Sequence, residues 1–259
     1  MNVSAVEYLI DHNGLKLYGQ PKWTFNKNTC NTYEMLVEKA MLDDNTLVPI
    51  WMISDLIEKD DGLALRFSRW FLEHALIETA RLTKECNVHI TVSMNLLPAY
   101  ANHSRFVDEV IRLTEAAGLD LNHHIQFEVC EPHKLNDAGV ANLNRLHDEY
   151  EVGLWLTNFG TGHSNVDMLR EVHYNGIELD RSFARHIPQE DQCCRMVYAI
   201  AQLAQTLDLQ VCAKGIETQD EFEFYEEMGA FKGQGFLIGR PMDLEHLKQY
   251  IMDYAIKKE

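Results

Sequence analysis

Six polar residues of this sequence stand directly after, or at the ends of, short apolar segments. Segments of this kind are typical of buried strands. When such strands run parallel in a closed barrel, their carboxyl ends share one edge, where barrel enzymes place their reacting groups. The alternative is that each strand simply ends in a polar residue where it meets water. The residues are Asn95, Glu128, Thr157, Asn158, Glu178 and Lys214.

The elements that would position these residues alternate along the chain. Short apolar segments are separated by longer amphipathic ones, which is the pattern of a mainly parallel α/β sheet. In one amphipathic segment Val197, Ile200, Ala201, Ala204 and Leu207 share a helical face. Eight predicted strands indicate a closed, TIM-like (β/α)8 barrel. They span residues 15–18, 33–37, 88–94, 125–129, 153–156, 176–179, 210–212 and 235–237.

Composition narrows the class of protein. A chain of 259 residues is long enough for one α/β barrel, so we expect a single domain over 1–259 with its motifs between about 14 and 243. The net charge of −17 disfavours nucleic acid as a partner and favours a basic protein. No signal peptide and no apolar run of membrane-spanning length is visible, so we expect a cytoplasmic protein without membrane contact. The six cysteines show no CxxC pair and are expected to be reduced.

Eight short motifs follow one another along nearly the whole chain. In order they are Gln20-Pro21, Glu34-Met35-Leu36, Met94-Asn95-Leu96, Glu128-Val129-Cys130-Glu131, Phe159-Gly160-Thr161-Gly162-His163-Ser164, Asp180-Arg181-Ser182-Phe183, Lys214-Gly215-Ile216-Glu217-Thr218 and Gln234-Gly235-Phe236. The series resembles the EAL domain, the cyclic di-GMP phosphodiesterase family. The first two motifs correspond to the family's Gln-Pro-Ile/Val and Glu-Ala-Leu.

The resemblance implies a reaction that depends on metal ions. Divalent ions would neutralise charge on a phosphodiester and activate the attacking water, and such ions prefer oxygen ligands. By resemblance the metal ligands Glu34, Asn95 and Glu128 are present. Thr157 and Asn158 stand where the family carries two adjacent aspartates. The sequence therefore keeps only part of the implied metal set.

At two further positions the sign of the charge is opposite to that in the family. Lys214 stands where the family has a glutamate ligand, and Glu178 where it has the lysine that helps orient the attacking water. The exchange indicates a replacement ion pair or, alternatively, two unrelated changes. Glu34, Glu128, Glu178 and Lys214 together give an expected net charge of −2 at the barrel rim. Lys214 would hold Glu34 and Glu128 ionised in place of a metal. No cofactor is expected, and any Mg²⁺ or Mn²⁺ binding should be weak.

The residues that would contact the dinucleotide are also altered. The resemblance places Glu38 where the family has an arginine that grips a ligand phosphate, which turns an attraction into a repulsion. Gln20, Asp180 and Gln234 remain as base or phosphate contacts, so we expect cyclic di-GMP binding to be weak or absent. Glu131 should anchor a neighbouring loop, its role in the family.

These departures predict that the chain is not an enzyme but a catalytically inactive EAL-like regulator. It would act through protein–protein interaction, for example on a transcription regulator of motility or virulence genes. The alternatives are a cyclic di-GMP receptor that does not hydrolyse its ligand and a weak residual phosphodiesterase. Because the family often dimerises near its catalytic loops, a homodimer is also implied.

Overall fold

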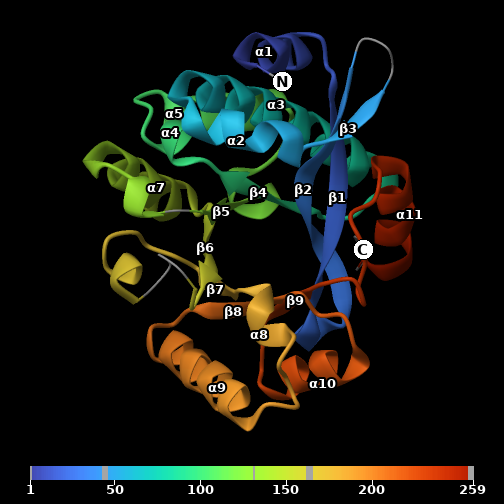
Figure 1. Ribbon diagram of the computed structural model, residues 1–259, viewed down its shortest axis with the longest axis vertical. Helices are drawn as coiled ribbons and strands as arrows, with labels where there is room; N and C mark the ends of the chain where they lie inside the picture. The colour runs from blue at the N-terminus through green and yellow to red at the C-terminus, as the bar shows by residue number, and fades with distance from the viewer. Residues whose placement is uncertain (1, 43–45, 131, 162–165, 256–259) are drawn as a thin grey trace.

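Eight strands close into a barrel in the computed structural model, which describes residues 2–42, 46–130, 132–161 and 166–255 (Figure 1). The ring closes because β1 pairs with both β2 and β9, so the predicted (β/α)8 barrel is confirmed. Its strands are β1 (Leu15–Thr24), β2 (Thr29–Met41), β4 (Thr91–Leu96), β5 (Ile125–Val129), β6 (Gly153–Phe159), β7 (Gly176–Leu179), β8 (Gln210–Lys214) and β9 (Lys232–Gln234).

One strand of the ring departs from the parallel arrangement. From β2 through β9 each neighbouring pair of barrel strands is parallel, whereas β1 runs antiparallel to both of its neighbours. Only the short η1 (Phe25–Lys27) and Asn28 connect β1 to β2, and a connection this short permits only antiparallel pairing. An additional strand, β3 (Leu47–Pro49), extends the sheet beside β2 and was not predicted.

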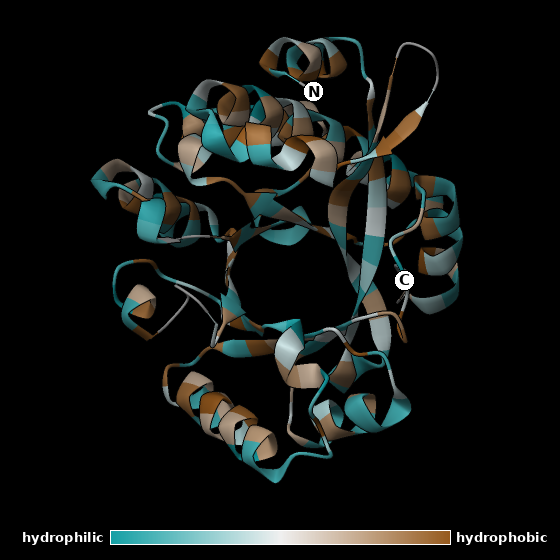
Figure 2. Cartoon of the chain, viewed as in Figure 1, coloured by the Kyte–Doolittle hydropathy of each residue, from teal (hydrophilic) through white to brown (hydrophobic). Residues whose placement is uncertain are grey.

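Helices surround this ring, and hydrophilic and hydrophobic stretches alternate along the barrel strands (Figure 2). In α9, Val197 and Ala204 are buried against the barrel, but Leu207 is exposed because the helix ends one residue earlier. The helices are α1 (Val3–Asp11), α2 (Trp51–Lys59), α3 (Asp61–Cys86), α4 (Pro98–Ala101), α5 (Phe106–Ala116), α6 (Leu121–His124), α7 (Asp137–Tyr150), α8 (Arg181–Ala184), α9 (Asp191–Thr206), α10 (Gln219–Glu227) and α11 (Leu244–Tyr254), with 3-10 turns η2 (Pro132–Lys134) and η3 (Val166–Arg170).

The last barrel strand lies three residues before its predicted position. The prediction chose 235–237 for its apolar residues, but Phe236 and Leu237 are exposed. The chain instead turns at Gly235, where a Cβ atom would lie 2.0 Å from the carbonyl oxygen of Ile216. Such close backbone contact requires glycine. The strand itself carries Lys232 and Gln234, whose buried side chains belong to a polar barrel interior.

Two further findings concern the cysteines and the hydropathy of the helices. All six cysteines are free thiols, as predicted. In the parts of the chain that the structure describes, no helix has both the length and the apolar composition needed to cross a membrane.

Candidate functional site

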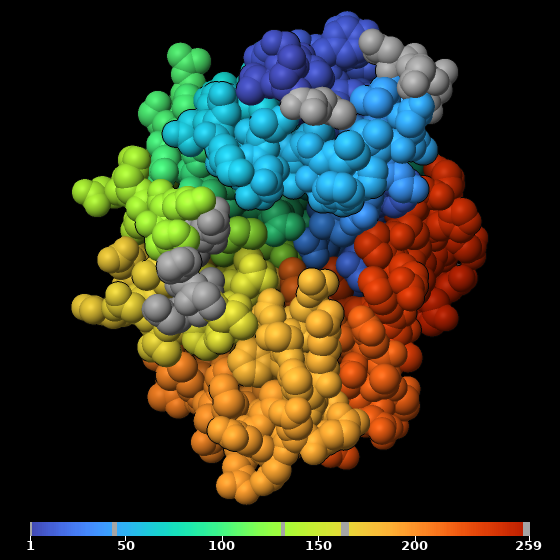
Figure 3. Space-filling model, in the orientation of Figure 1, coloured from blue at the N-terminus to red at the C-terminus, as the bar shows by residue number. Residues whose placement is uncertain are grey.

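A pocket of about 580 Å³ opens at the carboxyl ends of the barrel strands. Figure 3 shows this face hollowed near its centre, beside the light orange segment that follows β7. Most of the predicted site residues line this rim pocket, which brings together positions far apart in the sequence. The predicted residues in its wall are Gln20, Glu34, Glu38, Asn158, Asp180, Lys214 and Gln234.

Lys214 lies among three carboxylates at the floor of the rim pocket. Its Nζ is 2.5 Å from Glu128 Oε2 and 3.5 Å from Glu34 Oε2. It also lies 2.8 Å from Glu178 Oε2, as an ion pair rather than a well-directed hydrogen bond. The ion pair predicted from the exchange of lysine and glutamate is therefore present. The ammonium group is mostly buried, with 19% of the side chain exposed.

A second lysine, Lys22 of β1, supports the same carboxylates from below. Its Nζ donates to Glu128 and Glu178 at 2.6 Å each, and all three side chains are fully buried. Ser93 donates to the same oxygen of Glu128 at 2.7 Å. Lys22 was not among the predicted site residues. The signal was nonetheless there, because this lysine follows Gln20-Pro21 where the family motif has isoleucine or valine.

The electrostatics of this cluster follow from its composition. Glu34, Glu128 and Glu178 with two ammonium groups leave a net charge of −1, so the predicted −2 was wrong because it omitted Lys22. Burial alone would raise the pKa of Glu128, but Lys214 and Lys22 hold it well below its usual range. Burial and the neighbouring Glu128 carboxylate raise the pKa of Glu178. Burial opposes the charged form of Lys214, yet the carboxylates raise its pKa well above normal.

The arrangement does not fit the divalent ions that the sequence implied. The predicted ligands Glu34, Asn95 and Glu128 do converge, but Asn95 turns its amide nitrogen toward Glu34, at 2.7 Å. Its amide oxygen accepts from Cys130 Sγ at 3.0 Å. An ammonium group, that of Lys214, already lies among the carboxylate oxygens that would bind a cation.

Thr157 and Asn158 occupy different environments although they are adjacent. The pairing of β6 with β7 shifts register between Leu156 and Phe159, which marks a β-bulge. Within it Asn158 adopts a left-handed backbone with φ of 56°, which asparagine tolerates better than most residues, and lines the rim pocket. Thr157 is buried and does not line the pocket. Only one of the two positions therefore lines the rim pocket.

The remaining predicted contacts serve partly as structure. Asp180 caps α8 by accepting the Ser182 amide at 2.8 Å. Gln234 donates to Glu34 at 2.9 Å and to Gln20 at 3.3 Å. Burial and Glu34 raise the pKa of Glu38. Glu131 lies outside the described residues.

Two arginines in the wall of the rim pocket were missed. Arg181 and Arg185 are exposed, and neither forms an ion pair with a residue in the described ranges. Near them Phe236 presents an exposed ring, with the Arg240 guanidinium 3.9 Å from its centroid. Arg181 belongs to the motif Asp180-Arg181-Ser182-Phe183, but no contact with a ligand was predicted for it. Arg185 lies just outside that motif, so only the turn after β7 brings it to the pocket.

A third buried lysine gives a pH-dependent prediction. Burial and Lys22 lower the pKa of Lys232 to about 8, although its Nζ donates to Gln126 at 3.2 Å. Below that pH the folded state must hold the charged form, whereas the unfolded chain keeps its charge up to a higher pKa. Stability from this group therefore rises with pH. Between about pH 7 and about pH 9.5, the free energy of unfolding measured in urea should increase by about 2 kcal/mol more for wild type than for Lys232→Met. A constant difference, as expected for the exposed control Lys59→Met, would contradict it.

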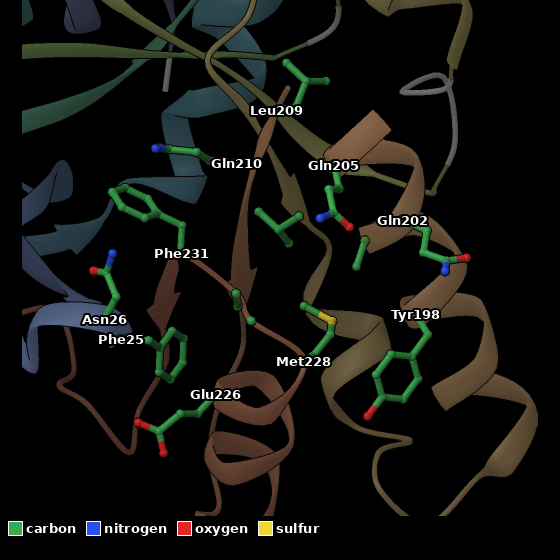
Figure 4. A pocket seen from close by; sticks show the side chains of 14 residues that line it. Phe25, Asn26, Tyr198, Gln202, Gln205, Leu209, Gln210, Glu226, Met228 and Phe231 are labelled. Carbon is green, nitrogen blue, oxygen red and sulfur yellow. The ribbon is translucent and has the colours of Figure 1, made fainter. Parts of the chain in front are cut away.

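A separate cleft of about 730 Å³ lies by the amino end of β8, between α9 and α10 (Figure 4). Aromatic and amide side chains line it, and no predicted site residue does. The labelled residues around it are Phe25, Asn26, Tyr198, Gln202, Gln205, Leu209, Gln210, Glu226, Met228 and Phe231. The rim pocket therefore remains the candidate functional site.

The fold and the rim pocket define a (β/α)8 barrel that gathers acids, amides and cations at the carboxyl ends of its strands. The EAL domain family matches residues 3–241, and the chain belongs to this family. A cyclic di-GMP phosphodiesterase of Pseudomonas aeruginosa is 30% identical over 239 residues, covering 92% of this chain and 40% of that protein. MucR, a bifunctional diguanylate cyclase/cyclic di-GMP phosphodiesterase of the same species, is 30% identical over 95% of this chain and 37% of its own length.

Solved structures agree with the fold. The PaMucR phosphodiesterase in its c-di-GMP complex has a TM-score of 0.83 at 27% identity, covering 95% of this chain and 98% of that one. The EAL enzyme Bd1971 in its cAMP-bound form has a TM-score of 0.88 at 23% identity, covering 96% and 69%. At that identity the second likeness shows the fold alone.

Family membership overturns the prediction that the chain is not an enzyme. Relatives that are 30%, 28% and 25% identical to it are named cyclic di-GMP phosphodiesterases. The prediction was wrong because it gave decisive weight to the residues missing from the implied metal set. It gave too little weight to the family match itself, which extends over residues 3–241.

Proposed function

We propose that this domain acts in cyclic di-GMP signalling by binding the dinucleotide in the rim pocket, without requiring a divalent ion. The observation that carries the proposal is the Lys214 ammonium group, 2.5, 2.8 and 3.5 Å from three carboxylates. This positive charge, together with Lys22, offsets the acids that would otherwise repel an anionic ligand. Binding of Mg²⁺ or Mn²⁺ should be weak for the same reason. The relatives named above supply the ligand class.

The walls of the rim pocket suit each part of such a ligand. Arg181 and Arg185 offer guanidinium groups for the phosphodiesters, and guanidinium–phosphate contacts are charge-assisted. Phe236 offers an exposed ring on which a guanine base can stack. Asp180 and Glu217 line the same pocket and can accept hydrogen bonds from guanine N–H groups. Glu38 lines the same pocket, and burial and Glu34 raise its pKa.

Arginine variants test this arrangement. The double variant Arg181→Ala/Arg185→Ala should bind cyclic di-GMP about 10- to 100-fold more weakly in isothermal titration, because hydrogen bonds to charged groups contribute about 1.5–3 kcal/mol. Arg170→Ala, which alters an exposed arginine on η3, is the matched control and should bind as wild type does. Equal affinities in the double variant and wild type would refute the assignment. Chromatography of the same samples measures any linear product, since hydrolysis is the activity named for the relatives.

The second candidate is a regulator that acts through protein–protein contact. Leu47, Trp51 and Met52 are exposed apolar side chains close together in sequence, and Trp51 is 70% exposed. The Ile50 amide between them donates to the Glu38 carbonyl at 2.9 Å, which places this patch beside the rim pocket. Such patches commonly mark interaction sites. Cross-linking from position 51 in the native cell, with and without cyclic di-GMP, would identify a partner. Cross-linking from position 196, where Met196 is also exposed, is the control. If position 51 gives no more cross-links than position 196, the result would count against this candidate.

A further inference from the structure

Two histidines and an aspartate converge on the outer surface of the barrel, away from the rim pocket. His147 and Asp148 lie in the last turn of α7, and His173 lies in the segment that leads into β7. The Nδ1 atoms of His147 and His173 are 2.9 and 3.0 Å from the same oxygen of Asp148. The three possible ligand atoms all lie within 4.8 Å of one another.

The surrounding backbone holds this cluster in place. Asn144, one turn earlier on α7, donates to the Glu171 carbonyl at 2.8 Å and accepts the His173 amide at 2.9 Å. Two residues further on, Asn175 exchanges hydrogen bonds with the backbone of Leu154 on β6. The segment that carries His173 is therefore fixed on both sides. Binding of a metal ion would require little ordering of this segment.

The chemistry of the cluster selects a class of ion. Imidazole nitrogens suit Zn²⁺ and other late first-row metals, whereas Mg²⁺ prefers oxygen ligands. A tetrahedral Zn²⁺ with bonds of about 2.0–2.1 Å separates its ligand atoms by about 3.3 Å. The nitrogen–oxygen separations here are 2.9–3.1 Å and each pair of ligand atoms lies within 4.8 Å, so changes in side-chain rotamer would suffice to admit the ion.

We propose that His147, Asp148 and His173 form a binding site for a divalent transition metal such as Zn²⁺. The ion would bind Nδ1 of each neutral imidazole, with the ring proton on Nε2, and leave its fourth position to water. It would link α7 to a segment 25 residues further along the chain. That segment enters β7, the strand that carries Glu178 of the rim pocket. The site is independent of the function proposed for the rim pocket.

Competition between the untagged full chain and a chromophoric zinc chelator tests the proposal. Wild type should bind one Zn²⁺ that His173→Gln binds at least about tenfold more weakly. The control is His246→Gln, because His246 also bonds an aspartate, Asp243, at 2.8 Å but belongs to no three-residue cluster among the described residues. Excess Mg²⁺ should not displace the bound Zn²⁺.

Two outcomes would overturn the site. One is a wild-type zinc affinity equal to that of His173→Gln, which would assign binding to other groups such as the free thiols. The other is an equal loss in His173→Gln and His246→Gln. Circular dichroism of each variant verifies folding, and both histidines are largely exposed, so the substitutions should leave the fold intact.

Discussion

Replacement of Lys214 by glutamate should convert the rim pocket into a strong divalent-metal site. In the wild-type protein the ammonium group lies 2.5 Å from Glu128 and 2.8 Å from Glu178, and competes with any cation for their oxygens. The variant would remove that competitor and add a fourth carboxylate. The cluster charge would change from −1 to −3, with only Lys22 left to offset four acids. Mn²⁺ affinity should therefore rise by at least about 100-fold, equivalent to about 2.7 kcal/mol.

Thermal unfolding with and without Mn²⁺ measures this change. With Mn²⁺ about 100-fold above its dissociation constant, Lys214→Glu should gain about 2.7 kcal/mol, or about 5–10 °C in Tm. Wild type at the same Mn²⁺ concentration should shift little. Lys59→Glu makes the same charge change at an exposed lysine and should behave like wild type. An equal Mn²⁺ response in wild type and Lys214→Glu would show that the ammonium does not exclude the ion.

Of the substitutions described here, Lys22→Met should cause the largest decrease in the free energy of unfolding. Lys22 is fully buried between Glu128 and Glu178, with both distances 2.6 Å. Without it two buried carboxylates would share one remaining ammonium group. Removal of one partner from a buried ionic cluster typically costs about 3–5 kcal/mol, because a charge is left uncompensated. We therefore expect Lys22→Met to lose about that amount in denaturant unfolding, and Lys59→Met to lose less than about 1 kcal/mol.

A double variant separates charge from packing in this prediction. Lys22→Met/Glu178→Gln removes one buried charge of each sign and should recover most of the lost stability. If Lys22→Met alone does not fold, the double variant still gives a measurement. A double variant as unstable as Lys22→Met, or a Lys22→Met loss no greater than that of Lys59→Met, would contradict the ionic account of the barrel interior.

Sequence patterns predicted the barrel because most of its strands are apolar and regularly spaced. All six barrel strands from β2 to β8 were predicted at overlapping positions, although 88–94 became Thr91–Leu96. The exchange of charge between Glu178 and Lys214 also predicted their ion pair, since the carboxyl ends of neighbouring parallel strands lie side by side.

Other features depend on contacts that a linear pattern does not contain. The strand β9 contains lysine, glycine and glutamine, which are poor strand formers, and is recognisable only from the polar interior it faces. Lys22 is stabilised by acids more than 100 residues away. His147 and His173 show no metal-ligand spacing along the chain, and only the packing of α7 beside the segment before β7 joins them.

If Lys214 supplies the positive charge in place of a metal, dinucleotide binding should not depend on a divalent ion. Calorimetric titration of the wild-type protein with cyclic di-GMP, first in excess EDTA and then in excess Mn²⁺, measures this most directly. We expect binding in EDTA with an affinity within about twofold of that in Mn²⁺, a difference of less than about 0.5 kcal/mol. Binding that appears only when Mn²⁺ is present would contradict it.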